Sequence, residues 1–270
     1  MRPAEKPPLK FPVAGTMKPR YHLLEVWPAV RQHLRTATDV ALFLDFDGTL
    51  APIRRRPEEV KLDLETRQVL QRLLEKPRLK LWIISGRGRA DLRRRVGLRT
   101  SNYLGIYGWQ GSTQVRLSRP AGRLLRGARG LFKEALAGLE GIWLEDKKVS
   151  FAIHYRGATE RSVQWARQFI QGVMRVFEPD LRMLSGKMVW EILPREIPGK
   201  GDNLRRLMAA EPLRTLPIII GDDKEDEEAF CVLSHAITVR VGSNGPTHAR
   251  YFLNGPKEVR KFLEALEAVL

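Results

Sequence analysis

Residues 41–50 read ALFLDFDGTL, a short apolar run that ends in two aspartates and a Gly-Thr turn. Such a run predicts a buried strand of a parallel sheet, because strands covered on both faces are continuously apolar. Ligands of open α/β sheets bind at the carboxyl ends of the strands. Asp45 and Asp47 therefore mark a predicted site, and Gly48 permits a turn that brings Asp47 over Asp45.

The same pattern continues on both sides of this strand. Further apolar strands are expected at 79–84, 216–220 and 236–241. Helices are expected at 23–34, at 62–76, after residue 87 to about residue 96, at 202–210 and at 257–270. Alternating strands and helices are typical of an α/β fold with a doubly wound parallel sheet.

Residues 109–193 have a different pattern, in which apolar and polar residues alternate. Strands are expected at 114–117, 141–145, 150–156 and 188–193, a hairpin turn near 146–148, and helices at 123–137 and 160–177. This pattern predicts an α+β unit inserted into a core formed by 21–108 and 194–270. The proline-rich residues 1–20 are expected to form a flexible arm.

The charge balance limits the partners. Forty-seven Lys and Arg against 31 Asp and Glu give a formal net charge of +16 in 270 residues. The basic residues do not alternate with aromatic ones as in a single-strand-binding surface, so no nucleic-acid partner is expected. No apolar run reaches the roughly 18 residues that span a bilayer, so no membrane partner is expected.

Cysteine usage bears on the compartment. The one cysteine, Cys231, excludes an internal disulfide and a cysteine-based zinc site. Together with an N-terminal stretch that lacks the apolar region of a secretory signal, it favours a cytoplasmic location. Cys231 is expected to be a small buried hydrophobic residue.

A second acidic group, Asp222, Asp223 and Asp226, follows the apolar strand at 216–220. Two acidic strand ends side by side would repel each other without a cation. Oxygen ligands without His or Cys favour Mg²⁺. The alternative is that these aspartates cap helices and form turns.

Four motifs occur in a fixed order: DFDGTL, SGR at 85–87, Lys200-Gly201 before a helix, and GDDKEDEEAF at 221–230. Their order resembles that of the haloacid dehalogenase-like (HAD-like) phosphatase superfamily. The resemblance implies that Asp45 is the nucleophile that forms an aspartyl-phosphate and that Asp47 is the general acid and base. It also implies that Mg²⁺ is held by Asp45, the backbone carbonyl of Asp47 and Asp222.

The same resemblance assigns the phosphate contacts. Ser85, Gly86 and Arg87 form the phosphate-binding segment, with Arg87 opening the following helix. Lys200 is catalytic and holds phosphoryl oxygens as charge spreads in the transition state. The alternatives are a helix N-cap for Ser85 and a solvated surface lysine for Lys200. Asp223 and Asp226 are expected to orient waters or the lysine.

Segments of the inserted unit at 109–193 narrow the resemblance from the superfamily to one family within it. LEDKKVSFAIHYR at 144–156 and SGKMVWEILP at 185–194 resemble segments of the cap domain of trehalose-6-phosphate phosphatases. This implies hydrolysis of trehalose 6-phosphate to trehalose and phosphate. One alternative is a phosphatase of another sugar or glycosyl phosphate, such as sucrose 6-phosphate or mannosyl-3-phosphoglycerate. Another is a basic nucleic-acid-binding or scaffolding protein on an inactive phosphatase fold.

Recognition of the sugar is expected from the cap. Lys187 and Glu191 are four residues apart, an even spacing that places both on one face of a strand. A surface ion pair is the alternative for these two residues. His154 is a further candidate, with core or surface packing as its alternative. Gln110 stands where the family usually has a glutamate, so a weaker contact is expected there. The expected partner is a small sugar phosphate, and a monomer is favoured.

Overall fold

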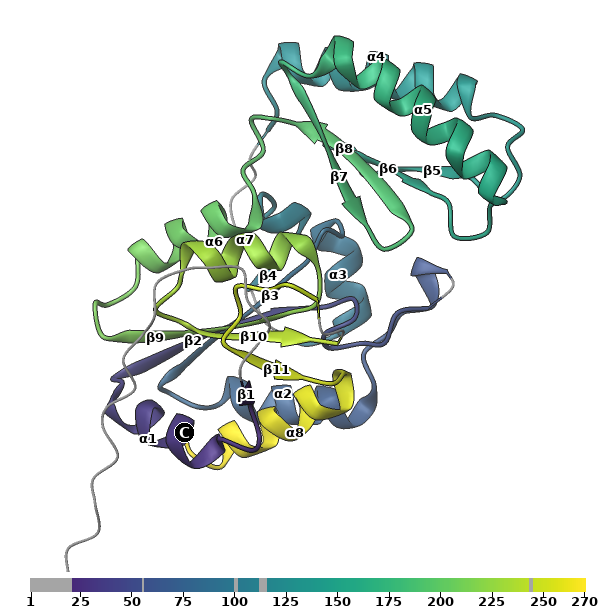
Figure 1. Cartoon of the computed structure of the whole chain (residues 1–270). Helices are drawn as coiled ribbons and strands as arrows, with labels where there is room; N and C mark the ends of the chain where they lie inside the picture. The colour runs from purple at the N-terminus through teal and green to yellow at the C-terminus, as the bar shows by residue number, and fades with distance from the viewer. Residues whose placement is uncertain (1–20, 55, 100–101, 112–115, 243–244) are drawn as a thin grey trace, which may run out of the picture.

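The computed structural model describes residues 21–54, 56–99, 102–111, 116–242 and 245–270. These residues form two sheets, each with its own helices (Figure 1). The first sheet has seven strands in the order β1-β11-β10-β9-β2-β3-β4, and all of its paired neighbours are parallel. The second has four antiparallel strands in the order β5-β6-β8-β7.

The parallel sheet and its helices form the core, which two stretches of the chain build. The first stretch contains β1 (Tyr21–His22), α1 (Trp27–Thr36), β2 (Asp39–Asp45), η1 (Pro57–Glu59), α2 (Leu64–Leu74), β3 (Leu79–Ile84), α3 (Arg89–Val96), β4 (Tyr103–Leu104) and η2 (Ile106–Gly108). The second contains α6 (Lys200–Ala209), β9 (Thr215–Gly221), α7 (Lys224–Val232), β10 (Ile237–Val241), β11 (Tyr251–Leu253) and α8 (Pro256–Glu267).

Side chains alternate along the central strand β2 and pack on both faces of the sheet. Leu42 and Leu44 belong to the cluster formed with α1, α2 and α8. Ala41 and Phe43 belong to the cluster formed with α6 and α7. Figure 1 shows these two groups of helices on opposite sides of the sheet. The predicted doubly wound parallel sheet is therefore confirmed.

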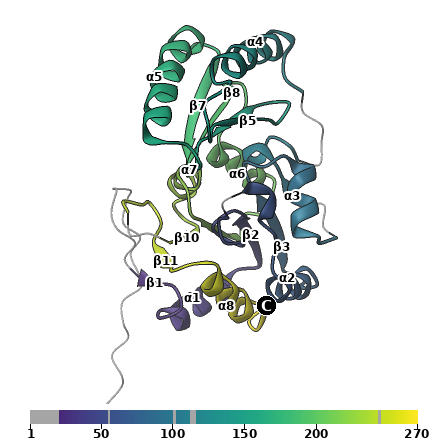
Figure 2. The same cartoon turned by 90° about the vertical axis from the view of Figure 1, so that its right-hand side faces the viewer.

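The antiparallel unit lies between η2 and α6 in the chain. It contains α4 (Arg119–Ala135), β5 (Trp143–Asp146), β6 (Phe151–His154), α5 (Glu160–Phe177), β7 (Leu181–Gly186) and β8 (Val189–Pro194). Phe151 and Ile153 pack with both helices in one apolar cluster. Ala152 and His154 therefore point to the opposite face, because side chains alternate along a strand. Figures 1 and 2 show this unit seated beside α6 and α7 of the core.

Some expected elements differ from the structure. Strand β7 was not predicted, and neither were the short strands β1, β4 and β11. Of the strand predicted at 114–117, residues 114 and 115 lie outside the described residues, and Arg116 and Leu117 form no strand. The predicted arm at 1–20 also lies outside the described residues.

Two further findings concern predictions for single residues and for the membrane. The prediction that Cys231 is buried is wrong, because it lies on the exposed side of α7. Among the described residues, none of the helices has the length and apolar character needed to cross a bilayer.

Candidate active site

Three motifs meet at one edge of the core sheet because their strands are neighbours. Strand β2 pairs in parallel with β3 on one side and with β9 on the other. Their carboxyl ends carry Asp45, Ser85 and Asp222, all three buried. Gly48 turns the chain after β2 with a φ of 91°, and a Cβ there would lie 2.1 Å from Asp222 Oδ2. Glycine is therefore required by both the turn and the close approach.

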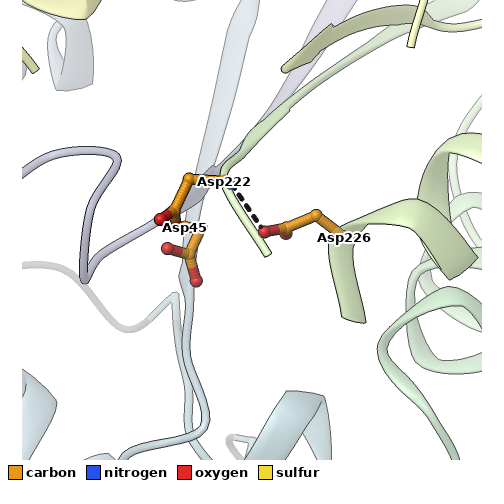
Figure 3. Close-up of side chains that lie close together, drawn as sticks. All are labelled: Asp45, Asp222 and Asp226. Atoms are coloured by element: carbon orange, nitrogen blue, oxygen red, sulfur yellow. Dashed lines mark hydrogen bonds between the residues drawn. The ribbon is translucent and has the colours of Figure 1, made fainter. Parts of the chain in front are cut away.

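A cluster of buried carboxylates results from this arrangement. One oxygen each from Asp45, Asp222 and Asp226 lies within 4.8 Å of the others. Figure 3 shows Asp45 and Asp222 side by side, with Asp226 reaching them from α7. Burial raises the pKa of Asp45 well above its ordinary value, and the charges of Asp226 and Asp222 add to the rise against the opposing Lys200.

Lys200 lies at the start of α6 with 1% of its side chain exposed. Its Nζ is 2.9 Å from Asp45 Oδ1 and 2.5 Å from Asp226 Oδ1. Burial alone would lower the pKa of Lys200, but Asp226 and Asp45 hold this pKa well above its ordinary value. Lys200 is therefore a buried cation within the carboxylate cluster and not a solvated surface lysine.

Asp223 and Asp226 form the N-terminal cap of α7. Asp223 accepts a hydrogen bond from the Asp226 N–H at 3.0 Å, and Asp226 Oδ2 accepts from the N–H groups of Asp223 and Asp222. This reciprocal pattern is a capping box. Burial raises the pKa of Asp223 to about 7, with Glu225 adding to the rise. The alternative of a capping role therefore holds for these two residues, and the cap fixes the position of Asp226 beside Lys200, as expected for a residue that orients the lysine.

The carboxylate cluster fits a divalent cation. Asp45 Oδ2 is buried and has no hydrogen-bond partner among the described residues. Asp226 has its oxygens on Lys200 and on backbone N–H groups. Asp45 is therefore the carboxylate best placed as a ligand. Asp222 can become a second ligand when Lys187 leaves it, and an all-oxygen set suits Mg²⁺.

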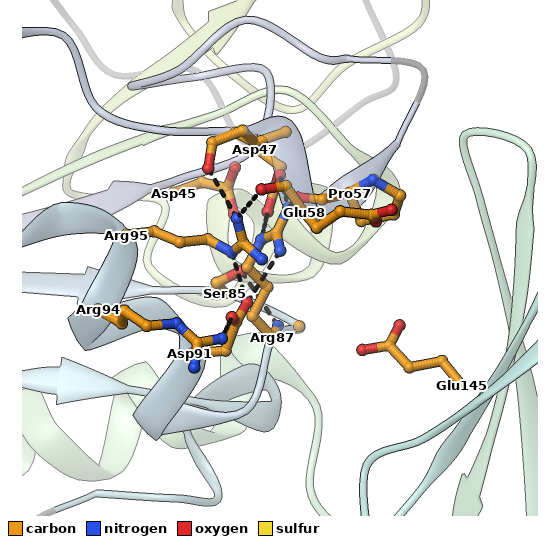
Figure 4. A network of polar contacts seen from close by, with 12 residues as sticks. Asp45, Asp47, Pro57, Glu58, Ser85, Arg87, Asp91, Arg94, Arg95 and Glu145 are labelled. Carbon is orange, nitrogen blue, oxygen red and sulfur yellow. Dashed lines mark hydrogen bonds and ion pairs between the residues drawn. The ribbon is translucent and has the colours of Figure 1, made fainter.

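Asp47 lies outside the buried cluster and is held by Arg87. The guanidinium donates from Nε to Asp47 Oδ2 at 2.6 Å and from Nη2 to Asp47 Oδ1 at 2.7 Å. It also donates to Asp91 at 3.0 Å and to the carbonyl of Pro57 (Figure 4). The prediction that Arg87 opens the next helix is wrong by two residues, because α3 begins at Arg89 after the N-cap Gly88.

Ser85 and Gly86 follow β3 directly. The Ser85 hydroxyl accepts a hydrogen bond from the backbone N–H of Arg87 at 3.1 Å. Ser85 is therefore not the N-cap of α3, whose N-cap is Gly88. A Cβ on Gly86 would lie 2.8 Å from the ring of Tyr107, so only glycine fits between this segment and that ring.

Glu191 of β8 is buried where the antiparallel unit meets the core. It accepts hydrogen bonds from the Tyr107 hydroxyl at 2.8 Å and from the Ser150 hydroxyl at 2.7 Å. It also pairs with Lys147 Nζ at 2.8 Å, and Lys147 reaches the carbonyl of Gly86 at 3.1 Å. Glu191 is therefore part of a buried network that joins the two units and not of a surface ion pair.

Lys187 occupies a different position from the one that its spacing suggested. It precedes β8 in the β7–β8 turn, where Met188 has a φ of 64°, so the alternation of a strand does not apply to it. Half of its side chain is exposed, and its Nζ forms an ion pair with Asp222. The structure thus brings Lys187 to the carboxylate cluster and Glu191 to the unit junction.

His154 lies on the sheet face that points away from α4 and α5. Its Nε2 is 2.8 Å from Glu145 Oε2, and its ring stacks on Trp143 at 3.9 Å. The neighbouring Tyr155 packs in the apolar cluster against Trp190, as alternation requires. Figure 4 shows Glu145 on β5, across from the Arg87 network.

Gln110 binds the core instead of an open cleft. Its side-chain oxygen accepts a hydrogen bond from the backbone N–H of Arg89 at 2.8 Å. This N–H belongs to the first turn of α3, so Gln110 satisfies one of the helix's unpaired donors. The contact leaves its amide nitrogen as the group that can donate.

Sequence reasoning missed two residues of the junction, Tyr107 and Lys147. Tyr107 has a φ of 57°, which is rare outside glycine, and it presses its ring onto Gly86. Its position between Gly105 and Gly108 was the feature of the sequence that could have indicated an unusual backbone at Tyr107. Lys147 lies in the predicted hairpin turn. A charged residue in a turn is expected to face solvent, so the sequence did not indicate that the side chain of Lys147 points toward Glu191.

Comparisons with known proteins agree on one protein family. A family model described as trehalose-phosphatase matches residues 43–257. Probable trehalose-phosphate phosphatase 2 of Oryza sativa subsp. japonica is 30% identical over 262 residues, which cover 84% of this chain and 68% of that protein.

Two solved structures are similar to the chain over most of its length. The C-terminal domain of C. albicans trehalose-6-phosphate phosphatase has a TM-score of 0.80 at 22% identity, covering 95% of this chain and 100% of that one. A trehalose-6-phosphate phosphatase related protein has a TM-score of 0.70 at 26% identity, covering 85% and 97%.

Proposed function

The chain belongs to the trehalose-phosphatase family and is a phosphoric monoester hydrolase, and from this premise we propose that it hydrolyses trehalose 6-phosphate to trehalose and phosphate with Mg²⁺ through an aspartyl-phosphate. One observation carries the catalytic part of the proposal. Asp45 ends the central strand with one oxygen on Lys200 and the other buried without a partner.

The first chemical step forms a bond between an Asp45 oxygen and phosphorus, and it breaks the bond between phosphorus and the sugar oxygen. Asp47 gives a proton to that sugar oxygen, so trehalose leaves neutral. In the second step Asp47 takes a proton from water, whose oxygen attacks phosphorus and frees Asp45 and phosphate. Arg87 holds both oxygens of Asp47 in this structure, so Asp47 has to leave at least one of these contacts to give or take a proton.

The phosphoryl oxygens are held by the segment after β3 and by Lys200. The Ser85 hydroxyl, the N–H of Gly86 and the Lys200 ammonium supply donors and positive charge near Asp45. Asp45, the carbonyl of Asp47 and Asp222 would hold Mg²⁺, which neutralises the approach of a carboxylate to a phosphate dianion. The cluster of buried carboxylates and the raised pKa of Asp45 support a cation at this place.

The sugar is recognised by a cap domain, which we propose to span 109–193, over a core of 21–108 and 194–270. Lys187, Glu191 and His154 face the core from this cap and offer both donors and acceptors to hydroxyls. Gln110 contributes a weaker contact through its amide. Ser150, Tyr107 and Lys147 fix the carboxylate of Glu191 before the sugar arrives.

The remaining proposals concern the partner, the oligomeric state and the location of the protein. The partner is a small sugar phosphate, and the protein acts as a monomer in the cytoplasm. A single cysteine in 270 residues suits a reducing compartment.

A phosphate-release assay tests the proposal. Trehalose 6-phosphate, sucrose 6-phosphate, mannosyl-3-phosphoglycerate and p-nitrophenyl phosphate are compared at equal enzyme, with Mg²⁺ and with EDTA. The highest kcat/KM is expected for trehalose 6-phosphate, and EDTA should abolish release until Mg²⁺ is restored. Preference for another sugar phosphate overturns the substrate, and full activity of metal-stripped enzyme overturns the mechanism.

A further inference from the structure

A second concave site lies outside the catalytic cluster, beside the beginning of α4. Its volume is about 470 Å³, within the range of small-molecule sites. Five of its lining residues are cationic: Arg116, Arg119, Arg123, Arg126 and Lys148. None of the described residues that line it is acidic. The cavity is open to solvent, and its lining concentrates positive charge.

Helical periodicity explains how the arginines share one wall. Arg119, Arg123 and Arg126 are spaced by four and three residues on α4, so their side chains leave the helix on one side. The first turn of α4 carries no acidic residue of its own, and the carboxylate at this helix end is that of Glu196. Like charges at this spacing destabilise a helix, so the fold alone does not account for them.

The charges of these arginines are not matched by ion pairs within the part of the chain that the structure describes. Among the described residues, no ion pair joins Arg119, Arg123 or Arg126 to a carboxylate, and all three are exposed. Arg129, one turn further along α4, does pair with Asp146. The contrast separates a paired arginine that fastens the helix to its sheet from the three that point into the cavity.

The cavity adjoins the segments that connect the two units. Glu196, between β8 and α6, accepts a hydrogen bond from the N–H of Ser118, the N-cap of α4, at 2.8 Å. Lys148 follows Lys147, whose side chain points the other way, to Gly86 and Glu191. An occupant of the cavity would therefore touch the same hairpin turn that contacts the phosphate-binding segment from its other side.

We propose that this cavity binds a small anion that carries two or more phosphate groups, independently of the substrate. Guanidinium groups bind phosphate through two parallel hydrogen bonds, and several such groups converging in one concave site match a diphosphate better than a single phosphate. The described part of the chain places no aromatic residue in the lining of the cavity, whereas sites for single-stranded nucleic acid stack bases on aromatic rings. The chemistry thus favours a compact phosphorylated anion over a nucleic acid.

Calorimetric titration of the full chain with pyrophosphate tests the proposal. EDTA is present, since without Mg²⁺ the carboxylates of the catalytic cluster repel an anion. The double variant Arg123→Gln/Arg126→Gln is expected to bind pyrophosphate at least roughly tenfold more weakly than the unmodified protein. The matched control Arg161→Gln/Arg175→Gln removes two exposed arginines of α5 and should bind within about twofold of it.

Further ligands distinguish the possible occupants. Binding of pyrophosphate and ADP with similar affinity, both at least roughly tenfold tighter than inorganic phosphate, supports a site that reads the diphosphate. The proposal is overturned if pyrophosphate does not bind, if the double variant binds it equally well, or if only a single-stranded oligonucleotide binds. Hydrolysis of p-nitrophenyl phosphate should be unchanged in the double variant, which checks that it is folded and keeps this test separate from the proposed function.

Discussion

The carboxylate cluster of the core and the Glu191 junction of the cap are built in different ways. The cluster is assembled from short stretches at the ends of adjacent parallel strands. The pairing of these strands therefore fixes where the backbone of each motif lies. The junction joins Glu191 on β8 to Tyr107 near η2 and to Lys147 in a hairpin turn. Its geometry depends on how an antiparallel sheet is seated on the core.

This difference assigns separate tasks to the two regions. Lys200 and Asp45 sit in a rigid, fully buried frame that suits a reaction common to all phosphate esters. Glu191 and Lys187 sit on a unit that approaches from outside, where discrimination between sugars has to arise. Substitutions in the core should therefore affect every substrate, and substitutions in the cap should affect the sugar phosphate.

The largest effect is expected for Asp45→Asn. Turnover should fall by roughly 10⁴-fold or more for both trehalose 6-phosphate and p-nitrophenyl phosphate, because the amide is a poor nucleophile. The protein should stay folded, since the substitution keeps the shape of the side chain and removes one charge from three crowded carboxylates. Thermal unfolding beside the kinetic assay separates the two effects. Normal turnover would mean that water attacks phosphorus directly.

A smaller and selective effect is expected for Tyr107→Phe. This change removes the hydrogen bond to Glu191 and keeps the ring that packs on Gly86. Glu191 retains Lys147 and Ser150, so kcat/KM for trehalose 6-phosphate should fall by roughly tenfold, the value of one hydrogen bond to a charged group. Hydrolysis of p-nitrophenyl phosphate should hardly change. An equal fall for both substrates would show that the hydroxyl shapes the phosphate-binding segment instead.

The smallest effect on activity is expected for Asp63→Ala, far from both regions. Asp63 is the N-cap of α2 and accepts hydrogen bonds from the N–H and hydroxyl of Thr66. Its loss should lower the free energy of unfolding by about 1 kcal/mol, measured by urea denaturation, and leave kcat/KM for both substrates unchanged. A change in either kcat/KM would mean that stability and activity are coupled across the core.

The same residue predicts a pH dependence of stability. Partial burial would raise the pKa of Asp63, but the hydrogen bonds from Thr66 and the charge of Arg260 hold the pKa below its ordinary value of 3.8. The contribution of this cap is therefore present above pH 3.8 and is lost as the pH falls through the lowered pKa. The difference in stability between Asp63→Ala and the unmodified protein should shrink in this acidic range. A difference that stays constant there would contradict the assignment.

The sequence predicted the core better than the cap, because the signals of the core lie within single short segments of the chain. Strand β3 of the core begins and ends where its apolar pattern does, and the acidic strand ends mark the carboxylate cluster. Lys187 was placed on a strand because nothing in the spacing reveals that the chain turns at Met188. Gln110 was expected near the sugar, but its contact with the first turn of α3 depends on packing between distant segments.

The division of tasks is tested most directly by the ratio of kcat/KM for trehalose 6-phosphate to that for p-nitrophenyl phosphate in Lys187→Ala and Glu191→Ala. Lys133→Ala, an exposed lysine of α4, serves as the matched control. The ratio is expected to fall by at least roughly tenfold in both cap variants and to stay unchanged in the control. An equal loss for both substrates would contradict the account, because these residues would then support the fold or the core and not the sugar.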